Sequence, residues 1–202
     1  LYKKNACFAP GHYYSPIVSV DEVKENQINI WKGIAENTIE GINLNEENQI
    51  ELVSKLEFFY PLLPFQESKA KDCRYYYDNE YYRHSDAIFL FGMIHYLKPK
   101  KIIEVGSGFS SALMLDTNTL FFENKIELYF IEPYPERLKS LMTDSDMDKV
   151  RIVIKKIQEI PISFFTTLES GDILFIDSSH VSKCGSDLNY ILFEILPILN
   201  NG

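Results

Sequence analysis

The chain has 202 residues, 46% of them hydrophobic, and its 29 acidic and 20 basic side chains give a formal net charge of -9. This size and apolar content predict a globular protein with one sizeable core, while the acidic balance argues against nucleic acid and anionic membranes as partners. No apolar run approaches the roughly 20 residues of a membrane span, and no signal-peptide core follows the N-terminus, so we expect a cytoplasmic protein.

Residues 1–83 are predicted to form a helical and aromatic extension. Ser19 can cap a helix that runs to about Gly41. Asn45 can cap a second helix, which Pro61 ends. The chain also has three widely separated cysteines, which suit neither a disulfide framework nor a zinc site and are expected to be reduced: Cys7, Cys73 and Cys184.

Two segments of this extension are rich in tyrosine, residues 10–16 and 74–82. They could fold over a cleft as a lid, with rings that bind a sugar or aromatic ligand, or pack as an aromatic shell. His12 and His84, in or beside these segments, are weak candidates for a site. His95 shares the apolar face of a predicted helix and is expected to be structural.

Residues 84–202 are predicted to form a second domain in which strands alternate with helices. Ser85 can cap its first helix, which Pro99 stops. We expect strands near 101–105, 126–131, 150–154 and 172–177, and helices near 109–122, 135–143, 161–169 and 186–199. Near-continuous apolar strands suit a doubly wound, mostly parallel, Rossmann-like sheet with its ligand at the carboxyl ends of the strands. Because the sequence stops where a fifth strand would begin, we expect a fragment of a longer fold.

A glycine loop follows the first strand and predicts a nucleotide-type cofactor site. Gly106 and Gly108 allow close approach of a ligand, and Ser110 and Ser111 begin a helix whose free N–H groups point at it. A dinucleotide fingerprint has a third glycine where Ser111 stands, which argues against NAD. A tight turn without a ligand is the simpler alternative.

Two acidic residues belong to the same pattern. Glu104 lies inside the first strand, where a carboxylate suits a cationic ligand such as an ammonium or sulfonium group. Glu132 ends the second strand, where an acid can accept hydrogen bonds from a ribose diol. The alternative for Glu132 is a solvated strand end, and the following Tyr134 could cover an adenosine or simply pack.

Asp177 ends the fourth predicted strand, and His180 follows it on a loop. His180 is placed to act as a general base or a metal ligand. The alternative has Asp177 capping nearby backbone amides and His180 exposed.

The segments 102–111, 130–134 and 172–180 resemble, in order, the first, second and fourth motifs of class I S-adenosylmethionine-dependent methyltransferases. The resemblance covers about residues 84–202 and is strongest to a bacterial group of uncharacterised small-molecule methyltransferases, of the methyltransferase domain 24 type. It implies a seven-stranded Rossmann-like sheet, of which the last three strands are missing from this sequence.

The resemblance also implies roles for single residues. The glycine loop and Glu104 would hold the methionine part, Glu132 the ribose and Gln158 the adenine. The implied cofactor-binding residues are Glu104, Gly106, Ser107, Gly108, Ser110, Ser111, Glu132, Pro133, Tyr134 and Gln158. Asp177 falls where catechol-type O-methyltransferases have a metal-binding acid, and His180 where they have a catalytic lysine, so dependence on a divalent metal such as Mg²⁺ stays open.

We therefore expect methyl transfer from S-adenosylmethionine to a small-molecule acceptor, on oxygen rather than nitrogen, with Asp177 and His180 as the catalytic residues. The alternatives are a non-catalytic S-adenosylmethionine-binding or regulatory module, a nicotinamide-dependent oxidoreductase, and a helical interaction protein. The acceptor and the oligomeric state are not specified by the sequence.

Overall fold

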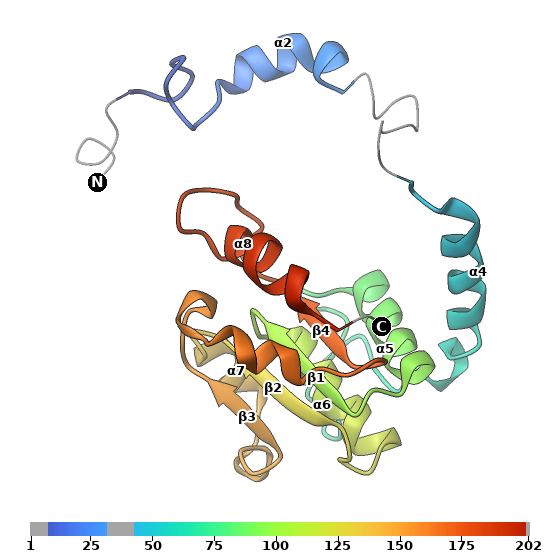
Figure 1. Cartoon of the computed structure of the whole chain (residues 1–202). Helices are drawn as coiled ribbons and strands as arrows, with labels where there is room; N and C mark the ends of the chain where they lie inside the picture. The colour runs from blue at the N-terminus through green and yellow to red at the C-terminus, as the bar shows by residue number, and fades with distance from the viewer. Residues whose placement is uncertain (1–7, 32–42, 201–202) are drawn as a thin grey trace. The chain divides into compact units, whose positions relative to one another are not determined.

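The computed structural model describes residues 8–31 and 43–200, which fall into two compact units, residues 1–49 and 50–202 (Figure 1). The predicted boundary lies at 83/84, whereas the second unit begins at Ile50. Phe65 and Tyr75 are buried in the same core as the sheet. The chain between 50 and 83 therefore belongs structurally with the sheet.

The first unit contains the helix α2 (Val20–Ile30). Ser19 caps it as predicted, because its Oγ accepts a hydrogen bond from the N–H of Glu22 at 3.3 Å. None of the residues of α2 is buried. The helix ends at Ile30 with Trp31 as its C-cap, so the prediction of one helix up to Gly41 is wrong at its end. Residues 32–41 and Cys7 lie outside the described residues.

The second unit is built on a four-stranded sheet whose strands are all parallel. Their order is β3-β2-β1-β4, so β1 and β2 are central. The strands are β1 (Lys101–Val105), β2 (Glu127–Ile131), β3 (Val150–Val153) and β4 (Ile173–Ile176). All four coincide with predicted strands, and the α/β architecture with a parallel sheet is confirmed.

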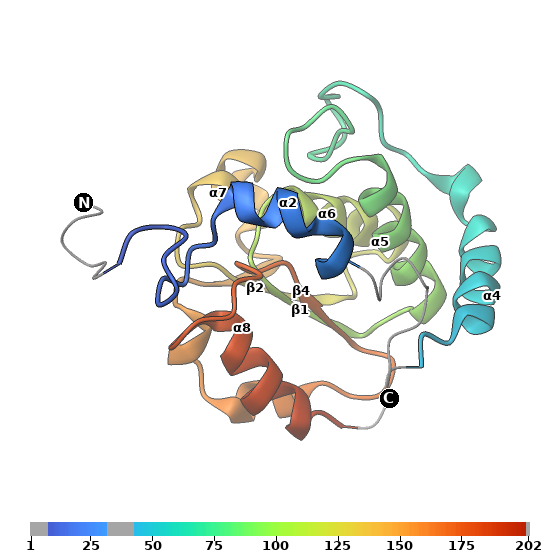
Figure 2. The same cartoon turned by 90° about the horizontal axis from the view of Figure 1, so that it is seen from above.

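Helices cover both faces of the sheet (Figure 2). The α-helices are α4 (Glu46–Glu57), α5 (His84–Leu97), α6 (Phe109–Phe121), α7 (Glu136–Leu141) and α8 (Asp187–Tyr190). Short 3-10 helices are η1 (Tyr60–Leu62), η2 (Asp144–Asp146), η3 (Ile157–Glu159), η4 (Ile162–Thr167) and η6 (Leu196–Ile198), and η5 (Ile191–Ile195) is a π-helix. The helices α5, α6 and α7 pack on one face, and η3, η4 and η5 on the other.

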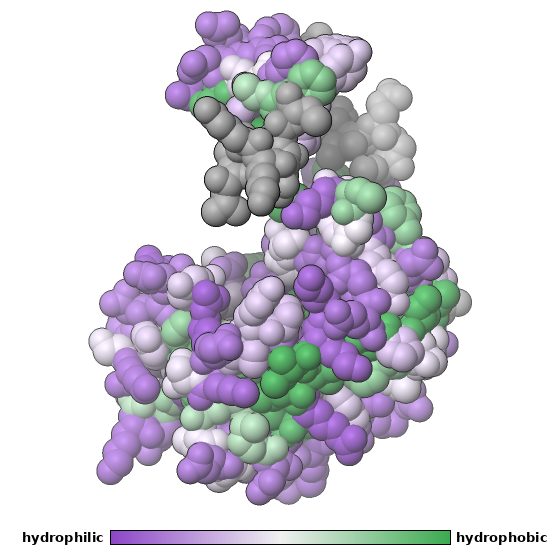
Figure 3. Space-filling model, turned by 90° about the vertical axis from the view of Figure 1, so that its left-hand side faces the viewer, coloured by the Kyte–Doolittle hydropathy of each residue, from purple (hydrophilic) through white to green (hydrophobic). Residues whose placement is uncertain are grey.

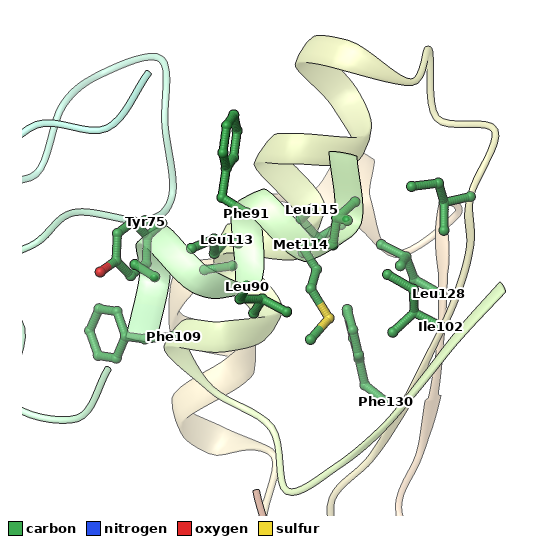
Figure 4. Close-up of a cluster of buried hydrophobic side chains, with 14 of the residues drawn as sticks. Tyr75, Leu90, Phe91, Ile102, Phe109, Leu113, Met114, Leu115, Leu128 and Phe130 are labelled. Carbon is green, nitrogen blue, oxygen red and sulfur yellow. The ribbon is translucent and has the colours of Figure 1, made fainter. Parts of the chain in front are cut away.

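Alternation along β1 assigns its side chains to the two faces. Ile102 belongs to the core under α5 and α6, whereas Ile103 and Val105 belong to the opposite core. Figure 4 shows side chains of α5, α6, β1 and β2 gathered in the first of these cores. Glu104 therefore points toward the α6 face, which decides its surroundings in the site.

Two predicted helices differ from the structure. The segment 161–169 forms the 3-10 helix η4, because its aromatic and β-branched residues are poor α-helix formers and Thr166 and Thr167 bond to carbonyls three residues back. The predicted helix over 186–199 is divided into α8, η5 and η6. Pro197 lies in η6, lacks an N–H and crowds the preceding turn, so a regular α-helix cannot continue through it.

Two predicted caps are wrong in detail. The helix α5 begins at His84 and has Arg83 at its N-cap, so Ser85 lies inside the first turn. His84 stacks on Tyr77 with ring centroids 4.8 Å apart, which fixes this end of the helix. The side chain of Asn45 accepts a hydrogen bond from the side chain of Asn48 instead of a backbone N–H.

A buried ion network fixes the tyrosine-rich segment to the sheet unit. Arg74 pairs with Asp116 of α6 and with Asp146 of η2. The backbone N–H groups of Arg74 and Tyr75 both donate to Asp116 Oδ2 at 2.8 Å. Burial by itself would raise the pKa of Asp146, but hydrogen bonds from Arg74 and Thr143 outweigh it and hold that pKa below its usual range.

Hydrophilic side chains predominate on the face shown in Figure 3 and surround a smaller hydrophobic area. Across the described ranges, no helix combines the length and the apolar character that crossing a membrane requires. Cys73 and Cys184 form no disulfide within the part of the chain that the structure describes.

Candidate functional site

The carboxyl ends of three parallel strands bring the predicted site residues to one edge of the sheet. The Gly106 N–H donates to the carbonyl of Ile131 at 3.0 Å, and the Asp177 N–H donates to the carbonyl of Val105 at 2.9 Å. Glu132 follows β2 at the same edge, where its N–H donates to the carbonyl of Val153 at 3.1 Å. Sheet hydrogen bonds thus continue past the strand ends and hold the glycine loop between its two neighbours.

A hydrogen bond holds Glu132 against the glycine loop. Its Oε2 accepts a hydrogen bond from the Ser107 N–H at 3.1 Å, and its Oε1 accepts one from the Tyr134 N–H at 2.8 Å. Each carboxylate oxygen can accept a further bond. Because the residue is only partly buried, the carboxylate can present those free positions to a ligand.

Glu104 lies beneath the loop and is fully buried. One carboxylate oxygen accepts a hydrogen bond from Ser110 Oγ and the other from Ser111 Oγ. Burial raises the pKa of Glu104 to about 8, against the opposing effect of these serines. The expectation that Glu104 contacts a ligand ammonium directly does not agree with this position, since β1 alternation turns its side chain into the protein. Its role here is to hold the start of α6.

The start of α6 offers unused hydrogen-bond donors. Ser111 Oγ accepts the N–H of Gly108 at 2.9 Å, but no described residue accepts the N–H groups of Phe109, Ser110 or Ser111. The buried Oγ of Ser107 also lacks a partner within hydrogen-bond geometry among the described residues. Free N–H groups and the positive end of the helix dipole favour a ligand with a negative or strongly polar group.

A small pocket of about 120 Å³ opens at this edge. The loop, Glu132 and Asp177 all contribute to its wall. Its full lining is Tyr81, Tyr82, Gly106, Ser107, Gly108, Phe109, Ser110, Glu132, Arg137 and Asp177. Six of the twelve predicted site residues line it, so the structure brings half of the predicted site together at this pocket: Gly106, Ser107, Gly108, Ser110, Glu132 and Asp177.

Four lining residues are absent from the sequence prediction of the site: Tyr81, Tyr82, Phe109 and Arg137. The guanidinium of Arg137 stacks over the ring of Tyr81, with its central carbon 3.6 Å from the ring centroid. The ring of Tyr81 in turn stacks on Phe109 at 6.1 Å. The tyrosine-rich segment was a weak signal for the first two, whereas nothing in the spacing of α7 marks Arg137.

Asn79 holds the segment that carries Tyr81 and Tyr82. Its Nδ2 donates to the carbonyls of Tyr76 and Tyr82 at 2.7 and 2.8 Å. Its Oδ1 accepts the N–H groups of Tyr81 and Tyr82 at 3.0 and 2.7 Å. Because Asn79 is itself buried, these bonds fix the loop over the pocket.

Asp177 and His180 form a pair at the rim. His180 Nε2 lies 3.3 Å from Asp177 Oδ1, and both side chains are about half exposed. His180 adopts a positive φ of 54°, an uncommon conformation for a residue other than glycine. Asp187 accepts both the N–H and the hydroxyl of Ser179, which fixes the loop between the two residues of the pair.

Other predicted residues lie outside the pocket. Gln158 Nε2 donates to the carbonyl of Gly185 at 3.0 Å. Tyr134 is 71% exposed, and Pro133 precedes it on the same loop. His84 pairs with Glu67 at 3.1 Å, away from the glycine loop. Contacts of Gln158, Pro133 and Tyr134 with a cofactor stay predictions.

His95 is buried, and its Nδ1 lies 2.9 Å from the carbonyl oxygen of Phe91. Burial lowers its pKa, which agrees with the predicted structural role. Within residues 8–31 and 43–200, no group of three or more His, Cys, Asp and Glu side chains is arranged to hold a metal ion. Asp177 and His180 thus have no third protein ligand there, and we assign no step to a metal.

The fold and the site define an α/β protein with a parallel sheet and a glycine-loop pocket at its carboxyl edge. The chain is 33% identical to an uncharacterised protein of Archaeoglobus fulgidus over 170 residues, which are 82% of this chain and 76% of the archaeal protein. The chain belongs to the same family as that archaeal protein. No protein-family model and no solved structure matches it.

Proposed function

We propose that this protein is an S-adenosylmethionine-dependent methyltransferase that acts on an oxygen of a small-molecule acceptor. The observation that carries the proposal is the position of Glu132, oriented by the N–H groups of Ser107 and Tyr134 beside the glycine loop. A carboxylate at the end of the second strand suits the two hydroxyls of a ribose. A dinucleotide would also place a ribose at such an acid, and it is Ser111, where a dinucleotide loop has its third glycine, that argues against NAD.

The residues of the pocket fit such a cofactor. Glu132 would hold the ribose, and the free N–H groups at the start of α6 would face the amino-acid part. Glu132 and Asp177 supply negative charge to a pocket whose ligand would carry a positive sulfonium. When bound, S-adenosylmethionine supplies an electrophilic methyl group, so the protein has mainly to align the acceptor and exclude water.

Asp177 and His180 would activate the acceptor. With His180 Nε2 held 3.3 Å from Asp177, the other ring nitrogen can take the proton of an acceptor hydroxyl. His180→Ala is expected to leave cofactor affinity unchanged and to lower turnover by about a hundredfold or more. Unchanged turnover on an identified acceptor would remove His180 from the mechanism.

Cofactor selectivity tests the proposal. We would titrate S-adenosylmethionine, S-adenosylhomocysteine and NAD⁺ into the full chain by calorimetry. The proposal predicts binding of both adenosyl sulfur compounds and none of NAD⁺. Binding of NAD⁺ alone would instead support an oxidoreductase, and binding without transfer to any acceptor would support a regulatory module.

A further inference from the structure

The guanidinium of Arg137 is held at the pocket by an aromatic ring and not by an acid. It stacks 3.6 Å above the centroid of Tyr81. Its side chain also passes over Gly108, where an added Cβ would lie 3.3 Å from Arg137 Cδ. No described residue forms an ion pair or a hydrogen bond with this guanidinium, although Glu132 and Asp177 line the same pocket.

Stacking leaves the donors of Arg137 available. A guanidinium uses its flat face on an aromatic ring, while its N–H groups radiate in the plane and can bind a carboxylate in two places at once. The free N–H groups of Phe109 and Ser110, together with the dipole of the 13-residue helix α6, add to the positive potential at this point. Arg137 and the start of α6 thus form one end of the pocket that favours an anion.

The rest of the pocket limits which anion fits. Glu132 and Asp177, at the ends of the two strands that flank β1, make the rest of the lining acidic, which disfavours a multiply charged phosphate. A zwitterionic amino-acid group offers one carboxylate to Arg137 and one cationic ammonium to the acidic lining. Building on the proposed function, we infer that Arg137 binds the carboxylate of the cofactor's amino-acid end, and that Tyr81 is the positioning residue that holds the guanidinium there.

Two ligands that differ in this end test the inference. S-Adenosylhomocysteine carries the amino-acid group, and 5′-methylthioadenosine keeps the adenosine and the sulfur but lacks that group. We would measure both affinities by calorimetry on the full chain, for the wild type, Arg137→Gln and Lys139→Gln. Lys139 is the matched control, because it is an exposed cation of α7 that does not line the pocket.

We expect Arg137→Gln to lower the affinity for S-adenosylhomocysteine by about tenfold or more, because a charge-assisted hydrogen bond is lost. The affinity for 5′-methylthioadenosine should stay unchanged. Lys139→Gln should alter neither affinity, and Tyr81→Phe, which keeps the ring, should behave as the wild type. Equal losses for both ligands, or no loss for either, would overturn the inference while the proposed function stands. If the wild type binds neither ligand, the proposed function fails, and the inference with it.

Discussion

A Cβ added to Gly106 would lie 1.9 Å from the carbonyl oxygen of Asp177. Gly106 also has a φ of +86°, so the position demands glycine both for its backbone and for its neighbour. This contact joins the loop after β1 to the end of β4. Together with the hydrogen bond from the Asp177 N–H to the Val105 carbonyl, this close approach fixes the part of the pocket proposed for the cofactor against the part proposed for the acceptor.

Gly106→Ala should destabilise the protein far more than the same substitution at a glycine with a similar φ angle. Gly171 is the matched control, because its φ is +87° and no described residue lies within 4 Å of an added Cβ. We expect Gly171→Ala to cost about 1 kcal/mol from backbone strain, and Gly106→Ala to cost about 3 kcal/mol or more. Urea unfolding of both variants measures the difference, and equal losses would show that the contact with Asp177 is unimportant.

The buried Glu104 should make stability depend on pH. Its pKa is raised to about 8, so the folded state keeps a proton that the unfolded chain releases near the ordinary value of 4.5. The protonated Glu104 makes its full contribution to the free energy of unfolding below about pH 4.5. That contribution is lost as the pH rises toward 8.

Glu104→Gln removes this titration, so its free energy of unfolding relative to the wild type should rise with pH by up to about 1.4 kcal/mol per unit in that range. Denaturant unfolding at several pH values checks this. A flat difference for Glu104→Gln would mean that the carboxyl is ionised throughout.

Asp116→Ala should destabilise the sheet unit by about 3 kcal/mol or more. The substitution leaves the partly buried Arg74 with one acidic partner and removes the acceptor of two backbone N–H groups. Asp148→Ala, at an exposed acid, should change stability by no more than about 0.5 kcal/mol. Urea unfolding compares the two, and a similar small effect for both would show that the network contributes little.

Asn79→Ala should loosen the segment over the pocket. Without the four bonds of the Asn79 side chain, the backbone near Tyr81 has to open more often. Chymotrypsin, which cuts after aromatic residues, should then cleave near Tyr81 several times faster than in the wild type. Asn48→Ala, at an exposed helical position, is the control and should not change that rate. Equal cleavage rates would mean that other contacts hold the segment.

Much of the fold could be predicted because each strand is a short apolar run bounded by turn residues. The grouping of Glu132 with the glycine loop also follows from sequence, since parallel strands end at the same edge. The burial of Glu104 was missed, although alternation along β1 already turns its side chain toward α6.

Arg137 and Tyr81 could not be assigned to the site from sequence. They lie 56 positions apart, and their stacking depends on the loop that Asn79 holds. The π-helix η5 could not be predicted from the sequence either, because over five residues the apolar pattern does not distinguish a π-turn from an α-turn. In each case the missing information is tertiary.

The affinity of Glu132→Gln for S-adenosylhomocysteine tests the central claim most directly, with Glu136→Gln, an exposed acid four residues on, as control. Glutamine keeps an acceptor for the Ser107 N–H but loses the charge that the ribose hydroxyls would meet. The proposed site predicts a loss of about tenfold to a hundredfold for Glu132→Gln and none for Glu136→Gln. Equal affinities in all three proteins would contradict a ribose at Glu132.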